Sequence, residues 1–318
     1  MRTIKAIAAA TALLAGTDAA QTVPSNSTTI TYHRTTVDGV GIFYREAGPY
    51  KTPTIVLLHG FPSSSVEFES LMPLLATHYH LIVPDYPGFG QSDAPPLSQY
   101  TYTFDHLALT TSHLLEQLKV GRYSLYIHDY GAPVGFRMMM AHPERLQALV
   151  VQNGNAYQEG LGKKWAGIAH YWADPKAHPD VVDVFTSLEA ARVRHAGDSP
   201  HPERYNPQVW EDEYAWLSRP GERAIQGSLL YDYRTNVASY PQWQAWLRQH
   251  QPPTLVVWGG YDTSFIAPGG GAYRRDLPEA EIHILDAGHF ALDEKVDEIA
   301  SLMLAFLHKH VDESTPVP

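Results

Sequence analysis

The sequence predicts an α/β fold, a mostly parallel central sheet flanked by helices, with an inserted helical cap. Three observations support this prediction. Continuous apolar runs, typical of strands buried on both faces, recur along the chain. Helical patterns lie between several of these runs, and one long stretch, residues 155–248, contains none of them. The chain has 318 residues, of which 44% are hydrophobic and 18% charged, enough to bury a large core.

The expected strands follow one another in a regular order. Residues 29–33 and 40–45 alternate apolar and polar side chains on either side of an Asp-Gly turn, which predicts an opening β-hairpin. Buried strands are expected at residues 54–58, 80–84, 123–127, 146–151, 254–258 and 282–285. Helices are expected at residues 104–118, 135–141 and 294–310.

The stretch without strands has a composition of its own. It holds six of the seven tryptophans and seven of the nineteen tyrosines, in helix-compatible pieces interrupted by Pro and Gly. We therefore expect a helical cap, or lid, at residues 155–248. It would be inserted between two parts of one core, residues 31–154 and 249–318.

The N-terminus has the features of a secretory signal peptide at residues 1–20. Arg2 and Lys5 precede an apolar run of 11 residues, 6–16, and small residues follow this run up to Ala20. This predicts a secreted protein or one of the secretory-pathway lumen, with residues 21–30 as a linker. A sequon at Asn26 is compatible with glycosylation.

Composition excludes several classes of partner and chemistry. A net charge of −11 argues against nucleic acid and anionic membranes as partners. The absence of cysteine removes thiolate nucleophiles and iron–sulfur clusters. The histidines show no recognised metal-ligand spacing. We therefore expect a small-molecule substrate, no cofactor and no metal, while the oligomeric state stays open.

Chemistry-bearing residues follow the expected strands, where open parallel sheets place their sites. An acid, Asp129, stands at a strand-to-helix turn, a second acid, Asp262, follows a later strand, and His289 comes last. This is the order of a nucleophile, an acid and a base in hydrolases with a sharp nucleophile turn. Asp286 and Asp293 are rival partners for His289, but Asp262 is preferred because it follows a buried strand.

Five motifs carry a resemblance to a known family. They are HGFP at residues 59–62, DYPGFGQS at 85–92, the turn at Asp129, WGGYD at 258–262 and GHF at 288–290. Over residues 31–310 the chain resembles the α/β-hydrolase superfamily, in its branch with an aspartate nucleophile: epoxide hydrolases and, more distantly, haloalkane dehalogenases. The resemblance implies the α/β-hydrolase fold and a triad of Asp129, Asp262 and His289. It also implies an oxyanion hole made by the backbone N–H groups of Phe61 and Tyr130.

The same resemblance suggests how a leaving group is activated. Epoxide hydrolases use two cap tyrosines to protonate the epoxide oxygen. Here Tyr233 is one candidate and Tyr171 the other, with Tyr157 as an alternative to Tyr171. Other side chains expected to contact an apolar substrate are His59, His128, Tyr157, Trp172 and Phe290.

Three functions remain open from the sequence. The first is an epoxide hydrolase that forms a vicinal diol. The second is a haloalkane dehalogenase with the same triad, which would place a Trp after the nucleophile and an Asn after His-Gly. This chain has Tyr130 and Phe61 at those positions, although Trp165 and Trp172 in the cap leave halide binding open. The third is a non-catalytic ligand-binding protein on the same fold.

Overall fold

Apolar strands form the centre of the molecule. The computed structural model describes residues 28–197 and 199–311, so the leader expected at residues 1–20 and the sequon at Asn26 lie outside it. The strands are β1 (Thr31–Val37), β2 (Val40–Ala47), β3 (Thr54–Leu58), β4 (His80–Pro84), β5 (Tyr123–His128), β6 (Leu146–Gln152), β7 (Thr254–Gly259) and β8 (Glu281–Leu285).

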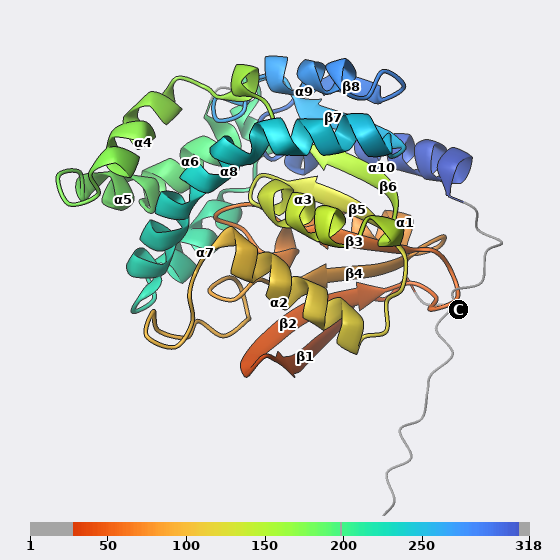
Figure 1. The fold of residues 1–318 in the computed structure, drawn as a ribbon, viewed down its shortest axis with the longest axis horizontal. Helices are drawn as coiled ribbons and strands as arrows, with labels where there is room; N and C mark the ends of the chain where they lie inside the picture. Colours follow the sequence, from red (N-terminus) through yellow and green to blue (C-terminus); the bar gives the residue numbers. More distant parts are fainter. Residues whose placement is uncertain (1–27, 198, 312–318) are drawn as a thin grey trace, which may run out of the picture.

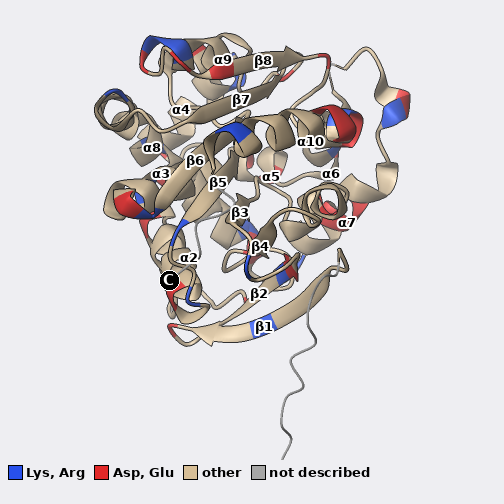
Figure 2. Ribbon diagram, turned by 90° about the vertical axis from the view of Figure 1, so that its right-hand side faces the viewer, with Lys and Arg blue, Asp and Glu red and all other residues tan. Residues whose placement is uncertain are grey.

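These strands form one sheet of eight, in the order β1-β2-β4-β3-β5-β6-β7-β8. β1 and β2 pair antiparallel, β2 pairs antiparallel with β4, and the remaining pairs are parallel. The sequence of β3, β5, β6 and β7 contains no Asp, Glu, Lys or Arg, and Figure 2 shows the charges mainly on helices and loops around them. The α/β fold class predicted from the apolar runs is confirmed.

Helices cover both faces of the sheet (Figure 1). α2, α3 and α8 pack on one face with the larger group of buried apolar side chains, whereas α1 and α10 pack on the other. The helices are α1 (Met72–Leu75), α2 (Phe104–Gln117), α3 (Gly131–Ala141), α4 (Lys164–Ala173), α5 (Asp180–Phe185), α6 (Leu188–Ala196), α7 (Pro207–Leu217), α8 (Glu222–His250), α9 (Pro268–Ala272) and α10 (Ala291–His310).

The chain between β6 and β7 is helical. It contributes α4 to α8, and α8 continues to His250, two residues beyond the expected end of the cap. This region packs onto the loops that follow β3 and β7, since Phe185 stacks on Phe61 and the Trp165 indole donates to the Ser264 carbonyl. Within residues 28–197 and 199–311, no helix combines the length and apolar character needed for a membrane span.

A tight turn joins β5 to α3 near the centre of the sheet. β5 ends at His128 and α3 begins at Gly131, so two residues reverse the chain. The backbone of Asp129 has a φ of 46°, a strained conformation for a residue other than Gly. A Cβ on Gly131 would lie 2.2 Å from the Leu58 carbonyl oxygen, so only Gly allows this close packing. The helix begins four residues before the predicted start because Pro133 is tolerated in a first turn.

Candidate active site

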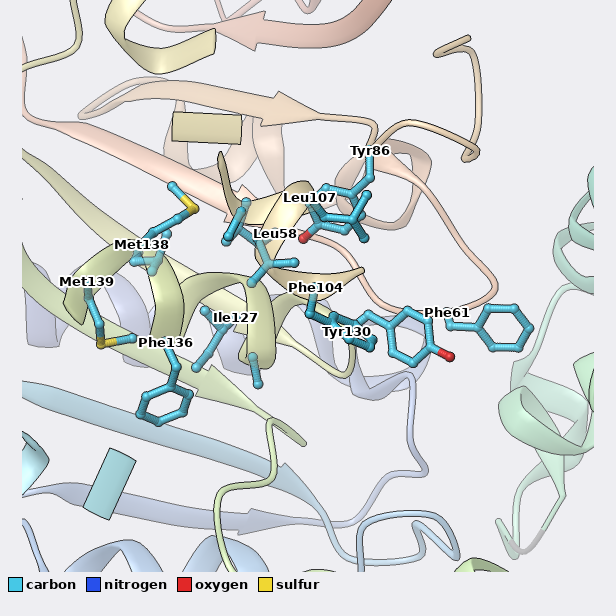
Figure 3. Close-up of a cluster of buried hydrophobic side chains, with 14 of the residues drawn as sticks. Leu58, Phe61, Tyr86, Phe104, Leu107, Ile127, Tyr130, Phe136, Met138 and Met139 are labelled. Atoms are coloured by element: carbon cyan, nitrogen blue, oxygen red, sulfur yellow. The ribbon is translucent and has the colours of Figure 1, made fainter. Parts of the chain in front are cut away.

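The side chain of Asp129 lies at the centre of a hydrogen-bonded site. Its Oδ1 accepts from the backbone N–H of Phe61 at 2.8 Å and of Tyr130 at 2.7 Å. Its Oδ2 lies 3.4 Å from His289 Nε2. The rings of Phe104, Tyr130 and Phe61 pack in a row (Figure 3). One carboxylate oxygen is therefore held by two backbone donors while the other faces an imidazole.

His289 joins Asp129 to Asp262. The His289 Nδ1 lies 2.6 Å from Asp262 Oδ2, and all three side chains are buried. Burial opposes ionisation of Asp129, but the hydrogen bond and charge of His289 outweigh it and lower the pKa of Asp129 to about 2. Burial likewise opposes the charged form of His289, but Asp262 and Asp129 together raise its pKa to about 9. The structure thus brings together the three residues predicted from the strand ends.

Asp262 is fixed by donors from three directions besides His289. Its Oδ1 accepts from the backbone N–H of Ser264 at 2.6 Å and of Phe265 at 3.1 Å. Its Oδ2 accepts from Asn153 Nδ2 at 2.8 Å. Asn153 follows β6, and its Oδ1 in turn accepts from the Gly259 N–H at 2.8 Å. The amide of Asn153 therefore orients the acid rather than replacing it.

The rival acids have other partners. Asp286 accepts from the Tyr261 hydroxyl at 2.6 Å. Asp293 lies 2.7 Å from His195 Nδ1. Their geometry favours Asp262 as the partner of His289.

His59 and His128, predicted to contact substrate, lie beneath the site instead. The His59 ring packs against Tyr86 at 4.2 Å, and its Nδ1 lies 2.9 Å from the Gly60 carbonyl oxygen. The Nδ1 of His128 lies 2.7 Å from the buried Glu67 carboxylate, and its Nε2 lies 3.1 Å from the His289 carbonyl oxygen. Because both rings are fully buried among protein groups, they support the loops that carry Phe61 and His289.

Tyr233 is a cap residue whose ring lies beside that of Tyr130. It is fully buried on α8, and its ring centroid lies 5.8 Å from that of Tyr130. Among the described residues its hydroxyl has no hydrogen-bond partner. Burial, the nearby Tyr240 hydroxyl and the charge of Asp129 raise the pKa of Tyr233 well above its ordinary value. Tyr233 therefore keeps its proton at neutral pH, with the Tyr240 hydroxyl close to its own.

The other two candidate tyrosines are placed differently. The Tyr171 hydroxyl donates to the Gly227 carbonyl at 3.0 Å, and its ring meets Tyr231 edge-on. The Tyr157 ring packs against Tyr273 at 5.0 Å and lies beside the Arg275 guanidinium. The structure shows no hydrogen bond from either hydroxyl to Asp129: the Gly227 carbonyl accepts that of Tyr171, and that of Tyr157 has no partner among the described residues.

The two cap tryptophans near Tyr233 have occupied N–H groups. Trp165 donates to the Ser264 carbonyl at 2.8 Å, and Trp172 donates to the Leu230 carbonyl at 2.7 Å. The ring of Trp165 packs at a tilt against Tyr233 at 4.6 Å, and that of Trp172 stacks on Tyr233 at 6.4 Å. Phe290, also expected at the substrate, stacks at 3.9 Å on His195 and packs behind His289.

Comparison with known proteins identifies the family to which this fold and site belong. Residues 53–296 match the family described as the alpha/beta hydrolase fold. The chain belongs to this family. An uncharacterised hydrolase of Saccharomyces cerevisiae, YNR064C, is 39% identical over 280 residues, covering 86% of this chain and 96% of its own. A haloalkane dehalogenase of Mycobacterium marinum is 37% identical over 275 residues, covering 83% and 87% of the two chains.

The solved structure of the epoxide hydrolase CorEH has the same fold as this α/β hydrolase. It superposes with a TM-score of 0.71 at 20% identity, covering 88% of this chain and 99% of its own. These similarities support a hydrolase of this superfamily and leave its substrate open.

Three polar residues of this α/β hydrolase were not predicted in their roles. The sequence locates Asn153 at a strand end, but its contact with Asp262 depends on side-chain geometry. Arg194 and Lys164 of the cap come near the site, and the charge of Asp129 acts on the pKa of both. Their positions follow from the register of the cap helices, for which the sequence gives no signal.

Proposed function

We propose that this α/β hydrolase opens epoxides to vicinal diols through a covalent ester on Asp129. The separate environments of its two carboxylate oxygens carry this proposal. Oδ1 accepts both backbone N–H groups, whereas Oδ2 faces His289 and would attack the epoxide. A carboxylate is a suitable nucleophile for a saturated carbon with a leaving group, and it gives an ester that water can hydrolyse.

Ester formation uses Asp129 and Tyr233. The pKa of Asp129 is lowered to about 2, so it is ionised at neutral pH. Its Oδ2 bonds to one epoxide carbon while the carbon–oxygen bond of the ring breaks, and the epoxide oxygen takes the proton of Tyr233. Oδ1 becomes the ester carbonyl oxygen, already facing the N–H groups of Phe61 and Tyr130.

Ester hydrolysis uses His289 as the base. It takes a proton from water, the resulting hydroxide adds to the Asp129 carbonyl carbon, and Asp262 stabilises the imidazolium. The negative charge on Oδ1 is held by the Phe61 and Tyr130 N–H groups, each worth roughly 10²–10³ in rate. Collapse breaks the bond between the carbonyl carbon and the ester oxygen, and that oxygen takes the proton held by His289 to complete the diol. The proton left on the Asp129 carboxyl then restores Tyr233.

Halide release is less well supported by this site. A leaving halide needs N–H donors that surround it, but the indoles of Trp165 and Trp172 donate to backbone carbonyls. Phe61 follows His59-Gly60 and offers no side-chain donor. The buried phenol of Tyr233 suits an oxygen that must gain a proton, and a halide has no need of one.

The test is to trap the ester. A His289→Ala variant incubated with styrene oxide should gain the mass of the whole epoxide, located on Asp129 by peptide mapping. With butyl bromide, a dehalogenase would instead gain a butyl group without bromine. The matched control is His283→Ala, on the outer strand β8, which should turn over styrene oxide without accumulating an adduct.

Two results would contradict the proposal. One is an adduct at a residue other than Asp129. The other is wild-type turnover of styrene oxide that survives in an Asp129→Asn variant. Binding of styrene oxide without turnover, unchanged in Asp129→Asn, would favour a binding protein.

Export through a cleaved leader at residues 1–20 is a separate proposal, supported by the sequence alone. Expression of the full chain in a secreting eukaryotic host should give mature protein in the medium that begins near residue 21. Edman sequencing of that protein tests it.

A further inference from the structure

A cavity lies between the cap and the loop that follows Asp262. Its volume is about 310 Å³, and it is lined by residues of α4, α5, α6 and the loop at Thr263 and Ser264. Most of its walls are apolar, with Ile168, Val184 and Phe185 among them. Two cations, Lys164 and Arg194, also line it. The combination of apolar walls and two cations suits a ligand with a hydrocarbon part and a negative end.

Arg194 connects this cavity to the oxyanion hole. Its guanidinium carbon lies 4.6 Å from the ring centroid of Phe61 and 4.6 Å from that of Phe185. Phe61 is the residue whose N–H binds Asp129. Arg194 Nη2 donates to the Phe185 carbonyl at 2.7 Å, but the buried Nη1 has no hydrogen-bond partner within residues 28–197 and 199–311. A buried cationic donor without a partner is costly, so an anionic ligand that pairs with it gains affinity.

Lys164 brings the second charge from α4. Its Nζ donates to the Ser264 hydroxyl, two residues after Asp262. Asp180, exposed at the start of α5, is the only acidic side chain among the described residues that line the cavity. The cations therefore outnumber the acids here, in a protein whose net charge is −11. This local excess offsets the repulsion that an anionic ligand would meet from Asp129 and the rest of the chain.

We propose that this cavity binds the anionic end of the substrate, a carboxylate that an apolar chain joins to the carbon attacked by Asp129. The proposal rests on the function proposed above. Arg194 would pair with the carboxylate through its guanidinium, and Lys164 would add a second charged donor. The apolar wall made by Ile168 and Phe185 would take the chain.

Ligand binding tests the cavity without catalysis. The probes are octanoate and octanamide, which share a chain and differ in charge. By calorimetry, the wild type should bind octanoate more tightly than octanamide. Arg194→Met or Lys164→Met should weaken the affinity for octanoate about ten- to hundredfold. Octanamide affinity should stay unchanged in both. Arg194→Lys keeps the charge and should retain part of the octanoate preference. It provides a test of the charge if Arg194→Met folds poorly.

The chain offers close controls. Arg192 lies on the same helix and pairs on the surface with Glu189, and Lys163 is an exposed neighbour of Lys164. Arg192→Met and Lys163→Met should leave the octanoate preference intact. Equal affinities of the wild type for octanoate and octanamide would overturn the proposal. So would a loss of octanoate affinity in these controls as large as in Arg194→Met and Lys164→Met.

Turnover separates this proposal from the proposed function. In Arg194→Met, the kcat/KM for an epoxide of oleic acid should fall about ten- to hundredfold, whereas the kcat/KM for the neutral amide of that epoxide should not change. Styrene oxide turnover without an octanoate preference would refute the anion site and leave the epoxide hydrolase standing. An octanoate preference without any epoxide adduct on Asp129 would support the anion site and reject the epoxide chemistry.

Discussion

Replacing Tyr233 and Tyr171 by phenylalanine, one at a time, should separate catalysis from stability. Tyr233→Phe removes one buried hydroxyl that has no partner among the described residues. Loss of a positioned acid typically costs about 10²–10⁴ in rate, so ester formation from an epoxide should slow by that factor. Stability should hold or rise by up to about 1 kcal/mol, because an unpaired buried polar group is removed.

Tyr171→Phe should have the opposite effect. The Tyr171 hydroxyl donates to the Gly227 carbonyl at 3.0 Å, within the cap. Losing this bond should cost about 1 kcal/mol of stability, since a typical buried hydrogen bond contributes about that much. The rate of ester formation should stay at the wild-type value, because the hydroxyl serves the packing of α4 on α8.

Two measurements on each variant distinguish these roles. Urea unfolding gives the stability change, and single-turnover mass spectrometry in the His289→Ala background gives the rate of ester formation with styrene oxide. An equal loss of rate in both variants would show that Tyr171 also acts as an acid. A full rate in Tyr233→Phe would refute its role as the proton donor.

Three further predictions concern groups around the site. Asn153→Ala removes the amide that binds Asp262 Oδ2 and the Gly259 N–H, and it should lower the free energy of unfolding in urea by about 1–3 kcal/mol. Ester hydrolysis should slow more than ester formation, so intact mass spectrometry should show the ester accumulating. His195 is buried, which alone would lower its pKa, but Glu213 and Asp293 raise it from 6.5 to about 10. Its stabilising contribution should be complete below about pH 6.5 and disappear as the pH rises toward about 10, a slope in urea unfolding that His195→Gln should flatten. Gly60→Ala would place a Cβ 2.6 Å from that of Asp129, so thermal unfolding should show a loss of about 1–3 kcal/mol, and turnover of styrene oxide should fall.

The strands and the triad could be predicted because both depend on local sequence. A continuous apolar run is a direct sign of a strand buried on both faces, and parallel strands bring their carboxyl ends together. That is why Asp129, Asp262 and His289 could be placed at one site before their distances were known. The start of α3 was less predictable, because Pro133 resembles a helix breaker although a first turn accepts it.

The cap could not be predicted to the same depth, because its helices take their register from tertiary contacts. Tyr171 and Tyr233 are both candidates from the sequence, yet one hydroxyl binds a carbonyl while the other has no hydrogen-bond partner among the described residues. Arg194 gives no sequence signal, since a cation on a cap helix is usually solvated. Only packing against Phe61 brings it to the oxyanion hole.

The charges around His289 also explain how its pKa can depend on the state of Asp129. In the resting site, Asp129 and Asp262 both favour its charged form and raise its pKa to about 9. Ester formation neutralises Asp129 and removes one of these two charges, so the pKa of His289 must fall when the ester forms. The nucleophile thus keeps its own base protonated until there is an ester to hydrolyse. Asp262, held by Asn153 and two backbone N–H groups, stays charged to stabilise the imidazolium that hydrolysis creates.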